Sequence, residues 1–570
     1  MRLLKININD GAFMWQGTWR DKIWNDLDRI WDIVIVGGGI TGAGILREAT
    51  RLGLRTLLIE QRDFAWGTSS RSSKLVHGGL RYLKEGKIGL TRAAVRERER
   101  LMQEGPGLID PLGFLLATYE GDHPGRLAYE AGLCVYDLLA LQWSHTHYSA
   151  DDFRMLAPHI SQEGLCGGFR YGDAQTDDAR LVLRVIREAV ADGGVAINYV
   201  TAEEFIFAPE PADKKLKADA VLPRCLRIRD NLTDKTGEIR SRVIINATGA
   251  WADQMRSQAG FGARIRPLRG SHLIFAGWRF PVAQAICILH PLDRRPVFIF
   301  PWEGITLVGT TDVDHGRPLQ DEPAISPEEV AYLMAAIESE FPALHITLDD
   351  VISSFSGVRP VIGTGKDNPS RESRDHVVWE EGGLLTVTGG KLTTFRLIAR
   401  DALKAVSHLL PEMLAPDRNI SVLNKVDLAL RINRSGKKTE LPERLRRRLL
   451  GRYGADAQRL LDCAKEGETE AIAGSMTIWA ELRFAARAEG VIHLDDLMLR
   501  RVRLGLLLPH GGRDILPQVR AICREELGWD ETRWRQEEKD YLSLWRNCYS
   551  IPQRSAIPDW NKLLDAAAEK

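Results

Sequence analysis

Residues 32–60 constrain the fold more than any other part of the chain. They begin with an apolar run, 32–36, which predicts a buried strand, and continue into Gly37-Gly38-Gly39-Ile40-Thr41-Gly42. In such a motif Gly37 allows the tight turn, Gly39 lets the backbone approach a pyrophosphate, and Gly42 permits close packing of the following helix. The N-terminus of that helix offers N–H donors and the positive end of its dipole to an anion. The motif therefore predicts one half of a dinucleotide-binding site.

The end of the same segment supplies the second half of the site. Gly53 stands where a helix C-cap is expected, residues 55–59 predict a second buried strand, and Glu60 ends that strand. An acidic side chain at this point accepts hydrogen bonds from ribose hydroxyls. The acid disfavours the 2′-phosphate of NADP, so FAD and NAD remain as ligands. A purely structural glycine-rich turn is the alternative interpretation, and the combination of strand, helix and terminal acid argues against it.

The composition is that of a soluble globular protein with two or three domains: 570 residues, 44% of them hydrophobic and 27% charged. Basic and acidic residues balance at 77 each, so the overall charge predicts no nucleic-acid partner. No stretch approaches the roughly 18 apolar residues of a membrane span, and the first residues lack the apolar core of a secretory signal. We therefore expect a cytoplasmic protein. The 7 cysteines form no C-x-x-C pair, which predicts reduced thiols and no metal site.

The composition also changes along the chain and predicts five regions. Residues 1–31 hold 4 tryptophans among charges, and we expect an extension packed on the body of the protein, with a membrane interface as the alternative. Residues 32–423 mix short apolar strands with helices. Residues 424–440 are polar and predict a linker, and residues 441–550 carry Leu, Arg, Glu and Ala at helical spacing. A separate helical domain is expected there, followed by a tail at 551–570.

Two further glycine-bearing segments favour a flavin over a simple nicotinamide dinucleotide. Each runs from a predicted buried strand into a glycine turn, and the turns contain Thr248-Gly249 and Gly389-Gly390. In the second case a helix follows, whose N-terminal dipole can stabilise negative charge on a reduced isoalloxazine. A nicotinamide site needs neither segment, whereas the longer FAD molecule needs contacts from distant parts of the chain. Taken singly, either segment could be a mere strand-to-helix turn.

Several motifs, in this order, resemble the FAD-dependent, aerobic-type glycerol-3-phosphate dehydrogenase family. They are residues 68–83 (TSSRSSKLVHGGLRYL), 270–272 (GSH), 309–312 (GTTD), 356–360 (SGVRP), 389–394 (GGKLTT) and 494–501 (LDDLMLRR). The first string is highly specific, and the shorter ones add weight through their order. Only residues 1–31 and about the last twenty fall outside the resemblance. It implies an α/β fold: a Rossmann-like FAD-binding domain of the D-amino-acid-oxidase and glycine-oxidase type, an interleaved α+β substrate domain and a C-terminal all-α domain.

The implied activity is oxidation of sn-glycerol 3-phosphate to dihydroxyacetone phosphate, with hydride transfer from C2 to flavin N5, in glycerol or glycerophospholipid catabolism. This reaction needs a base, a group that steadies the C2 oxygen, and cations for a phosphate dianion. The resemblance places His272 in the active site as the base and Arg359 beside the C2 oxygen, and which of the two accepts the proton stays open. Candidates for binding the substrate are Arg81, Tyr82, Arg374 and Lys391. Without the resemblance, a lone histidine beside a strand is usually structural, and an arginine before proline is usually a surface charge.

The resemblance also implies which residues hold FAD. The ADP half is assigned to Gly37, Gly39, Gly42 and Glu60; the rest of the cofactor is assigned to Ser69, Ser70, Ser73, Lys74, His77, Gly79, Thr248, Gly249, Gly389, Gly390, Leu392 and Thr393. His77 either faces the flavin or hydrogen-bonds its own loop. One mild departure is that Gly67 and Arg71 occupy positions where small residues are common in relatives, and Arg71 could alter the surface of the loop.

Quinone is the expected electron acceptor, because members of this family commonly reduce quinone as peripheral membrane enzymes. Oxidase-type relatives give electrons to oxygen and usually carry an extra insertion, which is not obvious here. Two basic segments, 444–452 and 500–508, could meet anionic lipid on the inner face of the cytoplasmic membrane. A solvated helix face and a core helix are the alternative interpretations. A homodimer is also compatible with the sequence.

Two other classes of function remain as alternatives. A flavin-dependent amine or amino-acid oxidase on the same scaffold would need a carboxylate-binding arginine but no cluster of phosphate-binding cations. A noncatalytic FAD-binding regulator would have no reason to keep His272 and Arg359 together.

Overall fold

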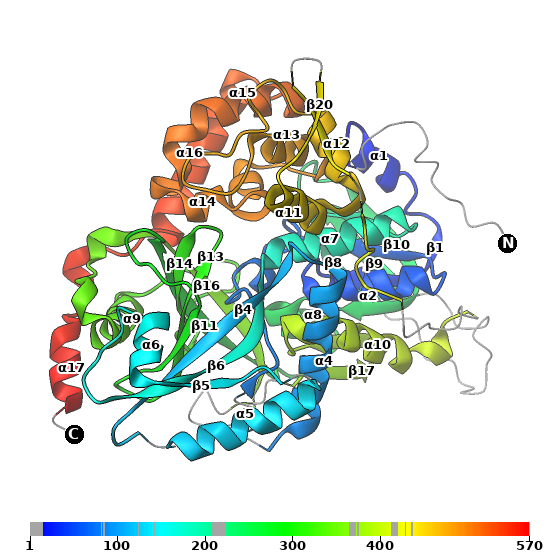
Figure 1. Cartoon of the computed structure of the whole chain (residues 1–570). Coiled ribbons are helices and arrows are strands. Elements are labelled where there is room, and N and C mark those ends of the chain that lie inside the picture. Colours follow the sequence, from blue (N-terminus) through cyan, green and yellow to red (C-terminus); the bar gives the residue numbers. More distant parts are fainter. Residues whose placement is uncertain are drawn as a thin grey trace.

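A computed structural model describes residues 15–80, 83, 86–122, 125–141, 143–206, 224–363, 372, 375–411, 420–427, 429–434 and 437–568. Two sheets and a C-terminal set of helices make up the molecule, with the helices lying above both sheets in Figure 1. Three predicted substrate-binding residues, Arg81, Tyr82 and Arg374, lie outside the described residues.

The first sheet has eight strands and a parallel centre. In spatial order they are β17 (Val377–Glu381), β18 (Leu384–Thr388), β10 (Thr236–Asn246), β1 (Ile30–Val36), β2 (Thr56–Ile59) and β7 (Val195–Ile197), with β9 (Arg224–Asp230) paired to β10 and β8 (Val200–Ile206) paired to β9. In β1, Ile33 and Ile35 pack under the helices α2 (Ile40–Arg51), α7 (Asp178–Ala191) and α10 (Phe395–Ala405). Val34 points to the opposite face and packs against the β8–β9 side. Both faces of β1 are therefore covered, which is why its sequence is a continuous apolar run.

The second sheet has ten strands and is mostly antiparallel. It contains β15 (Val313–Asp314), β11 (Ile265–Ala276), β14 (Ile305–Gly309), β13 (Pro296–Trp302), β12 (Ala285–Leu289), β4 (Ile109–Tyr119), β6 (Leu165–Thr176) and β3 (Leu75–Val76), with β16 (Val351–Ile362) paired to β11 and β5 (Thr146–Ser149) paired to β6. The helix α9 (Pro327–Glu340) covers one face and begins with a capping box formed by Ser326 and Glu329. Because its strands alternate along the chain with those of the first sheet, the prediction of an interleaved second domain is confirmed as part of the fold.

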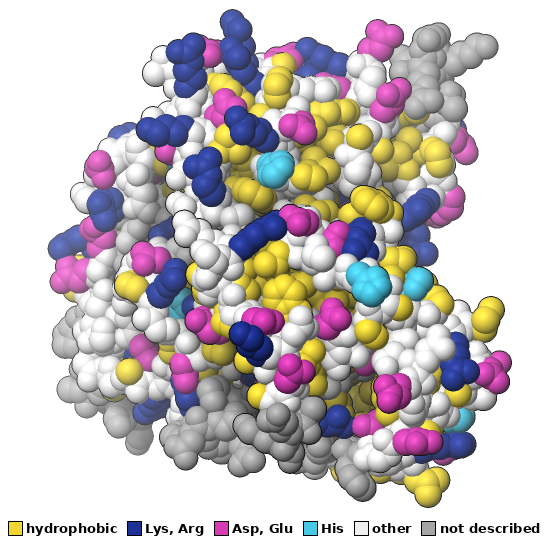
Figure 2. All heavy atoms as spheres, turned by 90° about the vertical axis from the view of Figure 1, so that its left-hand side faces the viewer, with side chains coloured by type: hydrophobic (Ala, Val, Ile, Leu, Met, Phe, Trp, Pro, Cys, Tyr) yellow, Lys and Arg dark blue, Asp and Glu magenta, His cyan; other side chains and the backbone are white. Residues whose placement is uncertain are grey.

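The other helices surround these two sheets. They are α1 (Trp19–Trp24), α4 (Ile88–Glu104), α5 (Arg126–Ala140), α6 (Ala150–Leu156) and α8 (Ala252–Gln258). Among the helices in the described part of the chain, none combines the length and apolarity that a membrane span requires. Figure 2 shows acidic and basic side chains interspersed over one face of the molecule, in line with the equal numbers of the two charges.

The C-terminal region is helical, as expected. Its helices are α11 (Glu443–Tyr453), α12 (Ala457–Asp462), α13 (Trp479–Ala488), α14 (Leu504–Leu507), α15 (Leu516–Leu527) and α16 (Glu531–Cys548), with a π-helical turn at Asp496–Arg501. One apolar cluster joins Leu504 and Leu507 of this domain to Trp302 and Phe355 of the second sheet. The helical domain therefore shares a hydrophobic core with the second sheet.

Three segments at the edges differ in detail from a simple extension, linker and tail. Trp15 and Trp31 are buried, and Trp15 stacks on Phe64 with ring centroids 5.2 Å apart. The expected linker contains a hairpin, β19 (Arg431–Arg434) and β20 (Lys437–Glu440), and Ile432 is buried in the core of the helical domain. The tail forms α17 (Trp560–Ala568), which returns to pack beside α9 (Figure 1).

Candidate active site

The parallel strands bring the predicted cofactor residues together at one edge of the first sheet. Val36 at the end of β1 lies beside Ile59 of β2 and Asn246 of β10, and Asn246 lies beside Thr386 of β18. Since parallel strands end at the same edge, the turns that follow them meet. They enclose a cavity of about 550 Å³. The predicted residues that line it are Gly37, Gly39, Glu60, Ser69, Thr248, Gly249, Gly389, Gly390, Lys391 and Leu392.

The glycine motif has the close approaches that its sequence predicts. Gly37 has a φ of +116°, and a Cβ there would lie 2.5 Å from the carbonyl oxygen of Ala247. A Cβ on Gly42 would collide with the carbonyl oxygen of Gly37, so this glycine serves the packing of α2 rather than the lining of the cavity. The amide of Ile40 in the first turn of α2 donates to Ser69 Oγ over 2.9 Å. The turn that follows β1 is thus tied to the loop that carries the serines.

Glu60 lines the cavity at the end of β2, as the sequence predicts. Its carboxylate accepts hydrogen bonds from the amides of Gly38 (2.7 Å) and Arg62 (2.9 Å). Burial raises the pKa of this carboxyl above its ordinary value. The carboxylate is therefore held in a fixed position beside the glycine turn.

Several residues that line the cavity were missed by the sequence reasoning. They are Val36, Ile40, Thr41, Gln61, Trp66, Gly67, Thr68, Ser72, Val200, Thr201, Ala202, Glu203, Ala247, Trp251, Gln254, Met255, Gln258, Pro360, Val387 and Thr388. Among them, the rings of Trp66 and Trp251 lie 5.8 Å apart. About half of these residues flank the glycine turns and motifs named above, as Ile40, Trp251 and Thr388 do. The others, which include Val200, Glu203 and Gln258, come from segments without such a motif, so no signal in the sequence marked them. A wall built from so many separate segments suits a long ligand such as FAD.

Other predicted cofactor residues do not line the cavity. The ammonium group of Lys74 is fully buried and bonded to Asp178 over 2.9 Å, so this cation acts inside the protein. The backbone of His77 exchanges hydrogen bonds with Thr393 Oγ1 at 3.1 and 3.2 Å, which joins its loop to the turn after β18. The remaining members of this group are Ser70, Ser73 and Gly79.

His272 lies on β11 in a buried setting. Its Nε2 is 2.9 Å from Ser73 Oγ, its ring stacks on Phe355 with centroids 4.5 Å apart, and its Nδ1 has no hydrogen-bond partner among the described residues. Burial lowers the pKa of His272 well below its ordinary value, and the positive charges of Arg359 and Lys74 lower it further. The imidazole is therefore neutral at working pH, which is the state a base requires.

Arg359 lies on the neighbouring strand, on the same face of the sheet as His272. In the β11–β16 register His272 pairs with Phe355, and Leu268 pairs with Arg359. Along each strand the two paired positions are an even number of residues apart, so their side chains point to the same face of the sheet. Gly270 lies between them, where a Cβ would come within 2.5 Å of the Arg359 guanidinium. This guanidinium also pairs with Asp312 at 3.1 Å. A neutral imidazole and a fixed cation thus share one face near the cavity.

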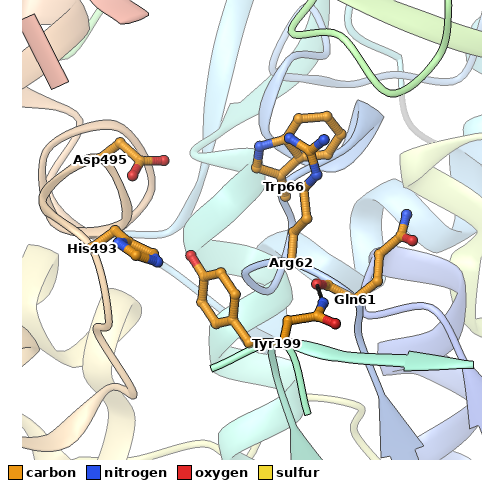
Figure 3. Close-up of a pocket in the computed structure, with 7 residues that line it drawn as sticks. Gln61, Arg62, Trp66, Tyr199, His493 and Asp495 are labelled. Atoms are coloured by element: carbon orange, nitrogen blue, oxygen red, sulfur yellow. Dashed lines mark hydrogen bonds between the residues drawn. The ribbon is translucent and has the colours of Figure 1, made fainter. Parts of the chain in front are cut away.

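A second, smaller cavity of about 370 Å³ adjoins the first at Gln61 and Trp66 (Figure 3). The guanidinium of Arg62 lies over the ring of Trp66, 3.9 Å from its centroid. Across the cavity the ring of Tyr199 faces His493 of the helical domain, with centroids 5.2 Å apart. The helical domain therefore reaches the edge of the cofactor cavity.

The prediction that the basic segments meet lipid is wrong for most of their arginines. In the first segment Arg448 and Arg452 are buried on Glu481, Glu303 and Asp177, whereas Arg444 and Arg447 are exposed and Arg446 is partly exposed. The second segment is a core segment. Its three arginines, Arg500, Arg501 and Arg503, are all buried and bind Asp63 or Asp178 of the FAD-binding domain. Arg71 is likewise buried, on Glu322 and Tyr549, and so does not alter the loop surface.

Comparison with known proteins agrees with this geometry. The family model described as FAD dependent oxidoreductase matches residues 32–402, and the model described as the C-terminal domain of alpha-glycerophosphate oxidase matches residues 425–534. The chain is 34% identical over 498 residues to the aerobic glycerol-3-phosphate dehydrogenase of Staphylococcus aureus (strain USA300), which covers 83% of this chain and 86% of that protein.

Solved structures show the same fold. The glycerol-3-phosphate dehydrogenase from Bacillus halodurans, complexed with FAD, matches with a TM-score of 0.70 at 28% identity and covers 93% of this chain and 98% of that one. The L-alpha-glycerophosphate oxidase from Mycoplasma pneumoniae, with FAD bound, matches with a TM-score of 0.55 at 16% identity over 70% of this chain and all of that one (100%), a likeness of fold. The chain is therefore an FAD-dependent oxidoreductase and belongs to the family of the aerobic glycerol-3-phosphate dehydrogenases.

Proposed function

We propose that this protein oxidises sn-glycerol 3-phosphate to dihydroxyacetone phosphate in glycerol or glycerophospholipid catabolism and passes the electrons to a quinone. The observation that carries the proposal is the neutral, buried imidazole of His272 on the same sheet face as Arg359, near a cavity whose walls suit FAD. The similarity to the S. aureus and B. halodurans glycerol-3-phosphate dehydrogenases supports the choice of substrate.

In the proposed reaction FAD, when bound, supplies the acceptor for the hydride that leaves C2. Gly37, Glu60 and the turns after β10 and β18 hold the cofactor. His272 takes the proton of the C2 hydroxyl, because its lowered pKa keeps the imidazole unprotonated. Arg359 steadies the C2 oxygen as its negative charge develops, since a guanidinium donates charge-assisted hydrogen bonds.

Lys391 is the described candidate for binding the phosphate. It lines the cavity in the turn between β18 and α10, next to Gly390. A phosphate held there uses binding energy far from C2 to orient the reacting carbon. Arg81, Tyr82 and Arg374 complete the proposed substrate-binding set.

The proposal of a quinone acceptor is supported by an apolar surface on α5. Leu127, Leu138, Leu141 and Trp143 on and just after this helix are 80%, 67%, 78% and 70% exposed. The opposite face of the helix is buried through Leu133 and Tyr136. A helix with one buried face and one exposed apolar face suits contact with the interface of a bilayer, and membrane quinones are dissolved in such a bilayer. The helix α5 itself lies at the outer edge of the molecule and packs beside α4 (Figure 1).

The deciding experiment is an anaerobic absorption spectrum of the FAD-loaded protein with glycerol 3-phosphate added. Loss of the oxidised flavin bands supports the proposal, and bands that persist with glycerol 3-phosphate but bleach with amines or amino acids contradict it. The reduced enzyme is then mixed with a water-soluble quinone or with oxygen. Faster reoxidation by quinone is expected, whereas faster reoxidation by oxygen identifies an oxidase.

The role of Lys391 is tested by comparing two substrates. Lys391→Ala should lower kcat/KM strongly for glycerol 3-phosphate and little for glycerol, so that the preference shrinks by about 10²-fold if a charge-assisted bond contributes roughly 1.5 to 3 kcal/mol. Equal losses on both substrates would assign Lys391 to the flavin or the fold.

A further inference from the structure

A short turn of serines, residues 69–74, connects the cofactor cavity to His272. At its start Ser69 Oγ accepts a hydrogen bond from the amide of Ile40, at the N-terminus of α2. Near its end Ser73 Oγ lies 2.9 Å from Nε2 of His272. The serine turn therefore carries the hydroxyl group that contacts the ring of the proposed base.

The helical domain inserts Arg503 into the centre of the serine turn. This side chain is 1% exposed, and its Nη2 donates to the carbonyl oxygen of Ser70 over 2.6 Å and to Asp178 Oδ1 over 3.1 Å. Its Nη1 donates to the carbonyl oxygen of Leu499 over 2.7 Å, within its own domain. One guanidinium thus bridges the two domains at the turn.

Asp178 completes the attachment from the other side. This buried carboxylate, at the start of α7, accepts from the amide and the hydroxyl of Ser72 at 2.9 and 2.8 Å. It also binds the ammonium group of Lys74 at 2.9 Å, which donates in turn to the carbonyl oxygen of Ser70. Burial and then the charge of Arg503 lower the pKa of Lys74 to about 8. Ser70, Ser72 and Lys74 are thus each hydrogen-bonded within the cluster that they form with Asp178 and Arg503.

We propose that Arg503 is a positioning residue: through Asp178 and the carbonyl oxygen of Ser70, the helical domain holds the serine turn in the conformation in which Ser73 orients His272. This inference rests on the base role proposed above for His272. It gives the helical domain a part in the reaction, although none of its residues is assigned to the substrate or the cofactor.

Two other buried ion pairs between the domains do not involve residues of the serine turn. Arg180 of α7 binds Glu489 of the helical domain through two hydrogen bonds of 2.6 and 2.8 Å. Arg501 binds Asp63 through two more of 2.6 and 2.7 Å. These pairs can hold the domains together when Arg503 is changed, and Glu489→Gln provides a matched control, because it weakens an interdomain pair of the same kind away from the turn.

The test compares Arg503→Lys, Ser73→Ala, their double variant, His272→Ala and Glu489→Gln. Each variant is loaded with FAD, its flavin content and Tm are measured, and the limiting rate of flavin reduction by glycerol 3-phosphate is followed anaerobically from pH 6 to 9. Lysine keeps the charge of Arg503 but cannot reach both acceptors with a planar fork. We expect Arg503→Lys to lower the limiting rate about 10- to 10²-fold at normal flavin content, with substrate affinity nearly unchanged.

If Arg503 acts through Ser73, the two changes are not additive, and the double variant is no slower than the slower single variant. Glu489→Gln should lower Tm while its reduction rate and pH profile match the parent. The inference is overturned if Arg503→Lys reduces flavin at the parent rate, if the two changes multiply, or if Glu489→Gln is slowed as much. If one of these results is found and His272→Ala still reduces flavin slowly, the positioning role is wrong and the proposed function is unaffected. If His272→Ala reduces flavin at the parent rate, both the base role and the positioning role are wrong.

Discussion

The chemistry at the residue scale depends on charges that are withdrawn from water. His272 has a neutral ring because burial and the two cations Arg359 and Lys74 all disfavour its protonated form. A histidine exposed at the surface, without burial and without these two cations, would be half protonated at a pH of about 6.5. The buried position on β11, rather than the residue type, therefore keeps this side chain neutral, which its proposed role as a base requires.

We predict that His272→Ala lowers the limiting rate of flavin reduction by about 10² to 10⁴-fold, because a general base contributes on that order. Substrate affinity should change little. In the parent, the lowered pKa keeps the imidazole neutral as the pH falls, so the rate should stay level from pH 9 down to about 6.5. Stopped-flow reduction at saturating substrate measures this. A limb with an apparent pKa above 6.5 that disappears in the variant would contradict the buried, neutral state.

Glu340 at the end of α9 gives a second prediction at this scale. Burial raises the pKa of its carboxyl from 4.5 to about 7, and the hydroxyl of Tyr119 donates to it over 2.8 Å. The folded state therefore binds a proton that the unfolded state has lost between pH 4.5 and 7, so stability falls as pH rises through this window. Glu340→Gln keeps the acceptor without the charge. The free energy of unfolding of the variant minus that of the parent should therefore be about 2.5 kcal/mol larger at pH 8 than at pH 5.

The measurement is the difference in Tm between the parent and Glu340→Gln at the two pH values. Tyr119→Phe in both backgrounds is the control, since it removes the hydrogen bond without adding a titrating group in this range. The same Tm difference at pH 5 and pH 8 would show that Glu340 ionises normally.

At the scale of elements, α5 shows how one helix can face two environments. Tyr136 on its inner face receives a hydrogen bond from the amide of Gly78 over 3.0 Å, which anchors the helix to the loop that leads to Arg81. On its outer face the side chains of Leu127 and Leu138 are exposed to solvent. Large exposed apolar patches on a soluble protein mark sites of interaction.

We predict that Leu138→Glu, alone or with Leu127→Glu, reduces binding to vesicles of mixed neutral and anionic lipid, because charge on the apolar face opposes its insertion. Turnover with a membrane-bound quinone should fall with it, while flavin reduction in solution stays at the parent rate. Trp278→Glu is the control, since Trp278 is 84% exposed and lies outside α5, between β11 and β12. Cosedimentation with vesicles measures the effect. Equal loss in the control, or no loss in the α5 variants, would remove α5 from the membrane contact.

At the scale of the whole molecule, buried arginines fasten the helical domain to the FAD-binding domain. Asp63 is fully buried after β2 and accepts from Arg500 Nε at 2.6 Å and from both terminal nitrogens of Arg501. Because the guanidinium groups of Arg500 and Arg501 both bind this carboxylate, its removal would leave two buried positive charges without their shared counter-charge.

We predict that Asp63→Asn destabilises the protein by about 3 to 5 kcal/mol and divides its thermal unfolding into two transitions, one for each domain. Differential scanning calorimetry of the FAD-loaded protein measures both effects. Arg487→Gln is the control, because it breaks a pair with Glu526 within the helical domain. A single transition in Asp63→Asn, with a Tm no lower than that of Arg487→Gln, would show that this carboxylate does not couple the domains.

The parts of the site that could be predicted from the sequence are those whose contacts are local. The strand, glycine turn, helix and terminal acid of residues 32–60 depend on backbone conformations and apolar faces that neighbouring residues encode. The motifs around His272 and Arg359 also marked two residues that the β11–β16 pairing places on one face. The expectation that FAD needs several distant glycine turns followed from the same local patterns, and the parallel strands bring those turns together.

Only the tertiary structure decided which charged residues are buried away from solvent. Lys74 meets Asp178 across 104 residues, Arg503 meets Ser70 across 433, and Arg501 meets Asp63 across 438. A basic helical segment has the same sequence pattern whether it faces lipid, solvent or a buried acid. The outcome depends on whether the fold delivers a carboxylate that offsets the desolvation of the cation, and that partner is not encoded nearby in the chain.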